Sequence, residues 1–109
     1  MNFFLNLNGK RKMGAIKNNA YLEREITLSL QFRAVSHPAR VKIMEQLMDH
    51  RLGCRNTDLA KWLHFAKPTV KNHIDMMKEA GMIEVEYFMH YYMIRLNAKG
   101  VDFAAKMLS

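Results

Sequence analysis

The sequence predicts a small α+β domain, mostly helical, with about five helices and a two-stranded β-hairpin before the last of them. Apolar residues recur at helical spacing through residues 19–80. Residues 82–96 instead alternate at a period near two and are rich in β-branched and aromatic side chains. A chain of 109 residues is long enough for one such domain and too short for a second.

Residues 1–18 have no sustained hydrophobic period and are expected to form a flexible basic arm, while residues 19–109 form the domain. The arm contains Gly9, Lys10, Arg11, Lys12 and Lys17. Such an arm can follow the phosphates of a nucleic acid, and a frayed terminus without function is the alternative.

Two helices are predicted first, separated at Ser36-His37-Pro38 because the residue before a proline avoids the α region. Residues 19–35 carry two apolar faces, one for the body of the domain and one for a second subunit. The faces are Leu22, Ile26 and Leu30, and Tyr21, Leu28, Phe32 and Val35. In residues 39–49 the expected core stripe is Val41, Met44, Leu47 and Met48, with Arg40, Lys42, Glu45 and Gln46 mostly outside it.

A helix-turn-helix follows, because only about four residues separate the next two predicted helices. Asn56 or Thr57 caps the first of them, which is short. Its buried edge comprises Leu59, Ala60 and Leu63. The second runs from Pro68 to about Ala80, and Gly81 ends it.

Residues 82–88 and 91–96 are predicted to be the strands of the hairpin, joined at Met89 and His90. Asn97 then caps a last amphipathic helix. One face of that helix comprises Val101, Ala104 or Ala105, and Leu108.

The helix that begins at Pro68 has the pattern of a recognition helix. Its buried edge is Val70, Ile74 and Met77, and the outward residues at its leading end are Lys67, Thr69, Lys71 and Asn72. Lysine can reach guanine or phosphate, asparagine can form two hydrogen bonds with adenine, and threonine can contact phosphate or a thymine methyl group. The alternative is an ordinary solvated helix face on which Lys71 and Asp75 form an i,i+4 ion pair.

Composition favours a nucleic-acid partner in a reducing compartment. Seventeen Lys and Arg against ten Asp and Glu give a formal net charge of +7, which attracts polyanions. The single cysteine, Cys54, excludes an internal disulfide and favours the cytoplasm. No membrane span of about 20 apolar residues is present. No nucleophile with its base, carboxylate dyad, phosphate-binding loop or metal cluster is visible, so no enzymatic activity or cofactor is expected.

Four segments of the chain occur together, in one order, in a known family. They are residues 32–44 (FRAVSHPARVKIM), residues 58–60 (DLA), residues 67–70 (KPTV) with His73 and Ile74, and residues 78–83 (KEAGMI). In these segments the chain resembles the ArsR/SmtB-type (arsenic-repressor-like) winged helix-turn-helix transcriptional regulators, over roughly residues 22–108.

The resemblance implies a homodimeric repressor that binds specific sequences of double-stranded DNA, with a recognition helix in the major groove and a wing near the backbone. The implied DNA contacts are Lys67, Thr69, Lys71, Asn72 and His73, with His90 and Arg95 as candidates from the wing. The implied dimer uses the first and last helices, through Leu22, Ile26, Leu30, Val101, Ala105 and Leu108. For His73 the alternative is a partly buried ring that is hydrogen-bonded inside the motif.

The chain departs from the family in the residues of its metal sites and of its turn. Arg55 and Thr57 stand where the family has two cysteines, and residues 97–109 offer Asp102 but no histidine. No metal is therefore expected, and the sequence identifies no effector. His64 replaces a glycine that ends a helix, and Ala66 replaces a capping serine.

The hairpin also departs from the family, because it is acidic and aromatic where relatives are often basic or have glycine. The residues concerned are Glu84, Glu86, Tyr87, Phe88 and Met89. Cross-strand packing is one role for the aromatic rings. The other is an exposed surface for a second protein, so the alternative function is a winged-helix protein–protein interaction module that uses the aromatic hairpin.

Overall fold

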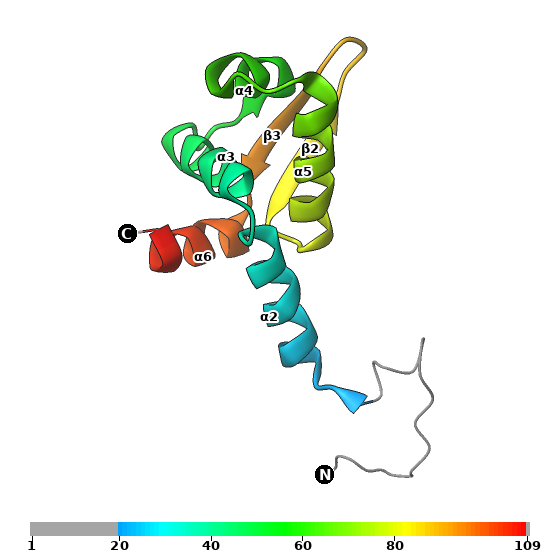
Figure 1. Ribbon diagram of the computed structural model, residues 1–109, viewed down its shortest axis with the longest axis vertical. Helices are drawn as coiled ribbons and strands as arrows, with labels where there is room; N and C mark the ends of the chain where they lie inside the picture. The colour runs from blue at the N-terminus through cyan, green and yellow to red at the C-terminus, as the bar shows by residue number, and fades with distance from the viewer. Residues whose placement is uncertain (1–19, 109) are drawn as a thin grey trace. The chain divides into compact units, whose positions relative to one another are not determined.

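The computed structural model describes residues 20–108, and its order of elements is the one that the sequence predicts, with one short strand added (Figure 1). The elements are α2 (Glu23–Ala34), α3 (Pro38–Asp49), β1 (Cys54–Arg55), α4 (Asn56–Leu63), α5 (Lys67–Glu79), β2 (Ile83–Tyr87), β3 (Tyr92–Leu96) and α6 (Ala98–Leu108). The predicted mostly helical α+β class is confirmed. The basic arm predicted at residues 1–18 lies outside the described residues.

The chain divides by packing into residues 1–30 and residues 31–109, and every element from α3 onward belongs to the second unit. Of the helices in the described part of the chain, none is long and apolar enough to cross a bilayer.

The sheet consists of three antiparallel strands in the order β1-β3-β2. Strands β2 and β3 form the predicted hairpin, which a hydrogen bond from the Phe88 N–H to the Tyr91 carbonyl closes. Strand β1 pairs Cys54 with Ile94 on the free edge of β3. The sequence did not predict β1, because a strand of 2 residues is too short to show an alternating pattern.

The two faces of the hairpin differ in burial, because successive side chains of a strand point to opposite faces. The inner face carries Ile83, Val85, Tyr87, Tyr92, Ile94 and Leu96, and the outer face carries Glu84, Glu86, Met93 and Arg95. Ile83, Ile94 and Leu96 are buried, so the inner face is the one that the helices cover. Together with side chains of α3, α4, α5 and α6 it forms the core.

Helix α3 corrects the predicted core stripe. Met44 and Leu47 are buried as predicted, but Ile43 joins them, and Val41 and Met48 are only half-buried. Arg40, which was expected mostly outside the core, is only 8% exposed. Its guanidinium Nε donates to the carbonyl of Ala34 at 3.1 Å, within the last turn of α2. A search for apolar residues at helical spacing misses such a residue. The guanidinium is buried because it donates hydrogen bonds to carbonyls that the end of a helix leaves without partners.

The turn between α4 and α5 has the conformation expected from its sequence. His64 ends α4 in the left-handed region, at φ 59° and ψ 41°. The Phe65 N–H then donates to the Ala60 carbonyl at 2.9 Å. At the start of α5, Ala66 provides no side-chain cap and Pro68 occupies the first turn. His64, in place of the family's glycine, and Ala66, in place of its capping serine, therefore both lie in the turn between α4 and α5.

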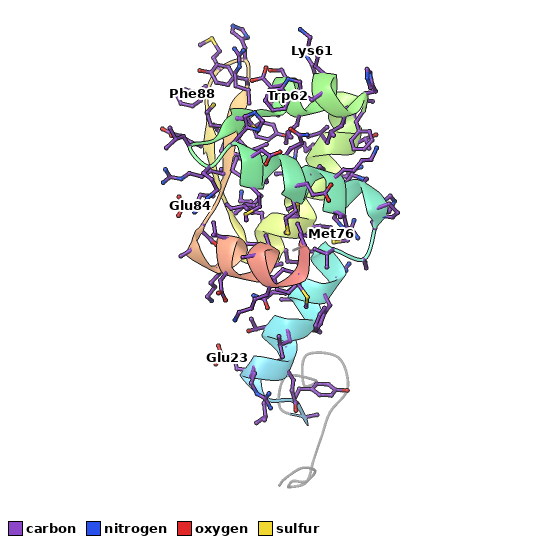
Figure 2. All side chains as sticks on the ribbon, turned by 90° about the vertical axis from the view of Figure 1, so that its left-hand side faces the viewer. Glu23, Lys61, Trp62, Met76, Glu84 and Phe88 are labelled. Carbon is purple, nitrogen blue, oxygen red and sulfur yellow. The ribbon has the colours of Figure 1, made fainter. Side chains whose placement is uncertain are left out.

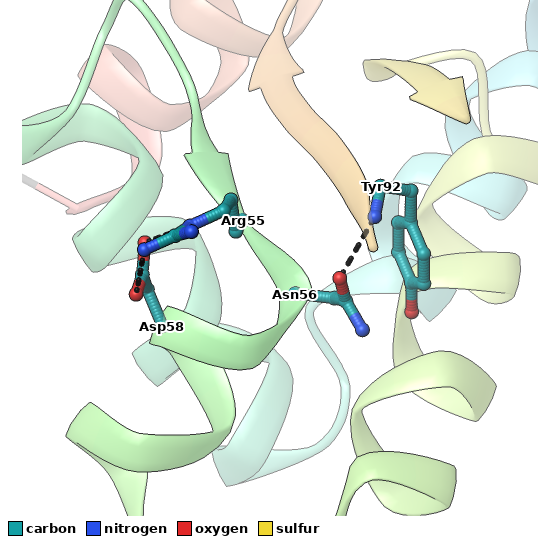
Figure 3. Close-up of polar contacts among 4 residues, drawn as sticks. All are labelled: Arg55, Asn56, Asp58 and Tyr92. Atoms are coloured by element: carbon teal, nitrogen blue, oxygen red, sulfur yellow. Dashed lines mark hydrogen bonds and ion pairs between the residues drawn. The ribbon is translucent and has the colours of Figure 1, made fainter. Parts of the chain in front are cut away.

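The predicted cap of α4 is wrong, as Figure 3 shows. Arg55 precedes the helix and gives no side-chain cap, and Asn56 lies inside the first turn. The Asn56 side-chain oxygen instead accepts a hydrogen bond from the Tyr92 N–H at 2.9 Å, which ties α4 to β3. Arg55 pairs with Asp58 at 3.2 Å between Nε and Oδ2. The tertiary bond to β3 outcompetes the local capping role of Asn56.

Helix α6 begins at the predicted cap and is held by a close backbone contact. The Asn97 side-chain oxygen accepts from the Gly100 N–H at 2.8 Å, and its amide donates to the Gly81 carbonyl at 2.8 Å. Gly100 itself lies against the Met82 carbonyl, where an added Cβ would overlap the oxygen. The approach of α6 to the turn before β2 therefore requires glycine at this position.

We expect the substitution Gly100→Ala to lower the free energy of unfolding by about 1–3 kcal/mol, the usual cost of overpacking. The sign is informative, because alanine is favoured over glycine inside a helix by about 1 kcal/mol. Urea unfolding followed by circular dichroism measures it, with Lys99→Ala on the exposed side of α6 as the control. An unchanged or increased stability of Gly100→Ala would contradict the close contact.

Candidate nucleic-acid interface

Helix α5 exposes the residues that the sequence predicts as DNA contacts at its leading end. Its opposite edge is anchored by Val70, Ile74 and Met77, which are 0%, 2% and 0% exposed. Helix α4 and strand β2 pack against α5. The exposed residues at the leading end are Lys67, Thr69, Lys71 and Asn72. The structure therefore brings these four candidates together on one solvent-exposed surface.

Lys71 forms an ion pair with Asp75, as the alternative interpretation of this helix face expected. The Lys71 ammonium donates to Asp75 Oδ2 at 2.9 Å, and both side chains are exposed. The hydrogen bond and charge of Asp75 raise the pKa of Lys71, so the ammonium is fully protonated at neutral pH. Solvent screens an exposed pair of this kind, which therefore adds little stability, so a phosphate group can replace Asp75 at little cost.

The first turn of α5 leaves backbone N–H groups without a side-chain acceptor. Ala66 supplies no capping oxygen, and the groups lie at the positive end of the helix dipole. Such N–H groups favour an anion, and in a protein of net charge +7 the surrounding field favours a polyanion.

The wing, which consists of β2, β3 and their connection, reaches the same end of the unit as the beginning of α5 (Figures 1 and 2). Lys61 and Trp62 of α4 lie at this end, whereas α6 lies toward the other (Figure 2). The Lys78 ammonium donates to the Tyr87 hydroxyl at 3.0 Å and lies 5.0 Å from the centre of its ring. One edge of α5 is thus attached to the wing.

Cross-strand packing, one of the two roles predicted for the wing aromatics, occurs in the structure. The rings of Tyr87 and Tyr92 are 5.6 Å apart, and those of Phe88 and Tyr91 stack at 5.0 Å. The Tyr92 hydroxyl is buried, and within the described residues it has no hydrogen-bond partner. Burial raises the pKa of Tyr92, so this hydroxyl stays protonated at neutral pH.

The two wing candidates for DNA contact lie apart from each other. His90 is exposed in the connection at the tip of the wing. Arg95 is on the outer face of β3, away from α5, and forms an ion pair with Glu84 at 2.7 Å. His90 therefore lies at the same end of the unit as the leading residues of α5. Arg95 does not lie with them.

His73 lies on the other edge of α5, facing α3. Its ring is half-buried, and its Nδ1 is 3.2 Å from Nη1 of Arg40. The rings of His73 and His37 are 4.9 Å apart. These contacts are the hydrogen-bonded arrangement inside the motif that was the alternative to a phosphate contact.

The candidate dimer residues of α6 form one stripe that the described part of the unit leaves partly open. Ala105 is exposed and Val101 and Leu108 are half-buried, whereas Ala104 is fully buried in the core. The outward-facing alanine is therefore Ala105. On α2, considered by itself, Leu22 is exposed and Ile26 and Leu30 are half-buried.

The positions that correspond to the metal ligands of the family that the chain resembles have side chains of a different kind. Arg55 is paired with Asp58, and Cys54, which is out of register with the family's cysteines, is buried. Burial, and then the charge of Asp58, raises the pKa of Cys54 to about 11, so the thiol is protonated at neutral pH. Among residues 20–108 no three His, Cys, Asp or Glu side chains are grouped as metal ligands would be.

Comparison with known proteins finds a family match in sequence and a likeness in fold. Residues 37–85 match the arsR family of bacterial regulatory proteins. None of the curated proteins matches the chain in sequence. The solved structure of HlyU from Vibrio cholerae N16961 superposes with a TM-score of 0.68, at 14% identity over 81% of this chain and 94% of HlyU.

Two further solved structures have the same fold. An ArsR family transcriptional regulator superposes with a TM-score of 0.65, at 19% identity over 81% of this chain and 89% of its own. The cadmium metal sensor CMTR from Mycobacterium tuberculosis gives 0.59, at 22% identity over 75% of this chain and 84% of its own. These identities are low, so the likeness shows the fold. The chain has the winged helix-turn-helix fold, and its residues 37–85 match the arsR family of bacterial regulatory proteins, the family that the sequence resembles.

Proposed function

We propose that the protein is a sequence-specific transcriptional regulator that binds double-stranded DNA, acting as a homodimeric repressor in the cytoplasm. One observation carries the proposal: the leading end of α5 presents Lys67, Thr69, Lys71 and Asn72 to solvent, while the opposite edge is buried. A helix anchored in this way can enter the major groove without disturbing the core. The arsR-family match over residues 37–85 supports the same function.

The contacts divide into positioning and base-reading roles. Lys67 and the uncapped N–H groups of the first turn are suited to phosphate, since they need only a negative charge nearby. Asn72 lies opposite the buried edge of α5, where its amide can form two hydrogen bonds with adenine. Lys71 exchanges Asp75 for phosphate or for guanine O6 and N7. His90 at the tip of the wing supplies a further contact near the backbone.

A dimer matches the symmetry of repressor sites, which repeat at about one helical turn of DNA. The stripe of Val101, Ala105 and Leu108 is the surface on α6 that a second copy would cover, together with Leu22, Ile26 and Leu30 of α2. Such a contact is isologous, so each of these side chains faces the equivalent surface of the other copy.

We propose that the repressor does not respond to a metal ion bound at the family's sites. Arg55 and Thr57 replace the two cysteines, and Arg55 is engaged with Asp58. Residues 97–109 contain no histidine to join Asp102.

We expect Lys71→Ala combined with Asn72→Ala to weaken binding of the preferred duplex by about 2–4 kcal/mol and to reduce the preference for that duplex over others. The duplex is first selected from a random library by the intact protein, and binding is measured by fluorescence anisotropy at several salt concentrations. Loss of Lys71 should also lower the slope of log affinity against log salt by about 1.

The matched control is Lys106→Ala on α6, because Lys106 forms the same kind of exposed i,i+4 ion pair with Asp102, at 3.2 Å. It should change neither the sequence preference nor the salt slope. Equal effects of Lys106→Ala and the double variant, or unchanged binding by the double variant, would show that α5 is not the recognition helix.

We expect Ala105→Glu to weaken self-association at least about tenfold, because the carboxylate would be buried against apolar side chains of the second copy. Analytical ultracentrifugation measures the dimer constant directly. Lys99→Glu, on the exposed polar side of the same helix, is the control and should leave the dimer intact. A dimer of undiminished strength in Ala105→Glu would exclude this stripe as the interface.

A second candidate function rests on the exposed wing. Tyr87, Phe88 and Met89 are 59%, 45% and 89% exposed, and Glu84 and Glu86 make the neighbouring surface acidic. Such a surface suits a protein–protein interaction module better than phosphate. A partner held there would bind with little salt dependence, in contrast to DNA.

A further inference from the structure

A polar cluster joins the recognition helix to the ends of α2 and α3. Its centre is Arg40, whose Nη1 lies 3.2 Å from Nδ1 of His73 on α5. The remaining guanidinium nitrogens bind the end of α2: Nε donates to the Ala34 carbonyl at 3.1 Å, and Nη2 donates to the Arg33 carbonyl at 3.1 Å. Nη2 also lies 3.3 Å from the Ser36 hydroxyl. One buried side chain thus connects three helices.

The contact between Arg40 and His73 fixes the protonation state of the histidine. A guanidinium has donors and no acceptor, so Nδ1 of His73 must accept and its proton must be on Nε2. Addition of a second proton, on Nδ1, would make this nitrogen a donor that faces the Arg40 guanidinium, which is also a donor. The hydrogen bond therefore exists only while His73 is neutral.

The surroundings of His73 all oppose its protonation. The titratable and charged groups against the ring are Arg40 of α3 and His37 in the segment before α3, with Arg33 of α2 beyond Arg40; Phe65, before α5, is apolar. Burial, then Arg40 and then His37, lowers the pKa of His73 below its ordinary value. No carboxylate acts on His73 within the described residues.

We propose that Arg40 and His73 form a positioning pair that holds α5 in the orientation needed to bind DNA, and that protonation of His73 releases this hold. The inference rests on the proposed function of α5. His73 is on the recognition helix, next in sequence to Asn72 and on the edge opposite to the one attached to the wing through Lys78. Loss of the contact leaves that edge free to move away from α3, so the leading end shifts relative to the wing.

Acid also lowers the stability of the folded protein through His73. Because the pKa of His73 is lower in the folded protein, the unfolded chain binds the proton more tightly. The stabilising contribution is complete above the ordinary histidine pKa of about 6.5 and is lost as the pH falls through the lower folded value. Circular dichroism at each pH therefore has to show that the protein is folded where DNA binding is compared.

The test follows binding of the selected duplex and of a scrambled duplex from about pH 8 down to the lowest pH at which circular dichroism shows the folded protein, at constant ionic strength. We expect the preference of the intact protein for the selected duplex to fall about tenfold or more as His73 becomes protonated. His73→Gln retains an acceptor oxygen for Arg40 but cannot titrate, so its affinity near pH 8 should be kept and the acid loss abolished. His73→Leu should lose about tenfold in affinity at every pH.

His50→Gln is the matched control, because His50 stacks on Trp62 and donates to the Gln46 carbonyl, away from α5. It should keep the full acid loss. An acid loss that persists in His73→Gln would overturn the proposal. So would an affinity that rises with acid and no longer rises in His73→Gln, because that pattern would mark His73 as a phosphate contact.

A readout without DNA separates this inference from the proposed function. Nitrogen-15 shifts of the His73 imidazole in the free protein should show the tautomer with the proton on Nε2 at neutral pH. The opposite tautomer would overturn the positioning pair even if the protein binds DNA. Failure of the intact protein to bind any duplex at neutral pH would instead overturn the proposed function, and the role assigned to the pair with it.

Discussion

Burial of one edge of α5 determines which residues of this helix face solvent. Val70, Ile74 and Met77 are almost completely removed from solvent. Each buried side chain of this size contributes about 1.5–3 kcal/mol relative to exposure. Rotation of α5 about its axis would expose this edge, so the helix has one orientation in which its polar residues face outward. The proposed DNA contacts therefore follow from hydrophobic packing on the opposite side.

Two polar contacts refine that orientation from the sides. Lys78 attaches one edge of α5 to Tyr87 in the wing, and Arg40 attaches the other edge through His73 to α2 and α3. Such contacts add little to the stability of a packed helix but are directional. They are therefore suited to set small rotations of α5, and a groove-bound helix is sensitive to small rotations.

The local parts of this arrangement could be predicted from the sequence. The apolar edge of α5 and the Asn97 cap depend on neighbours within a few positions, and the structure has both. The left-handed residue His64 was indicated instead by the resemblance, in which a glycine ends the helix at this position. The non-local parts could not be predicted. Asn56 bonds to Tyr92 across 36 positions and Arg40 to His73 across 33, and no short pattern indicates either partner. Hydrophobic periodicity also assigns an arginine to the outside by default, which made the prediction for Arg40 wrong.

In the candidate site, too, the local arrangement could be predicted from the sequence and the non-local arrangement could not. The four α5 residues were predicted as one set because helical spacing relates them, and they lie on one exposed surface. His90 and Arg95 were grouped because they share a hairpin. Alternation along β3 and the pairing of Arg95 with Glu84 put Arg95 on the outer face, away from α5. The sequence contains that alternation, but it does not say which face of the hairpin α5 covers.

The most direct test is an NMR titration of the amide groups of the intact protein with a duplex selected by the protein itself. If the leading end of α5 enters the groove, the largest shift changes will fall on residues 66–72 and on the wing connection, with little change in α6 outside a dimer contact. Shift changes confined to the wing or to α6, with residues 66–72 unaffected, would contradict a recognition role for α5.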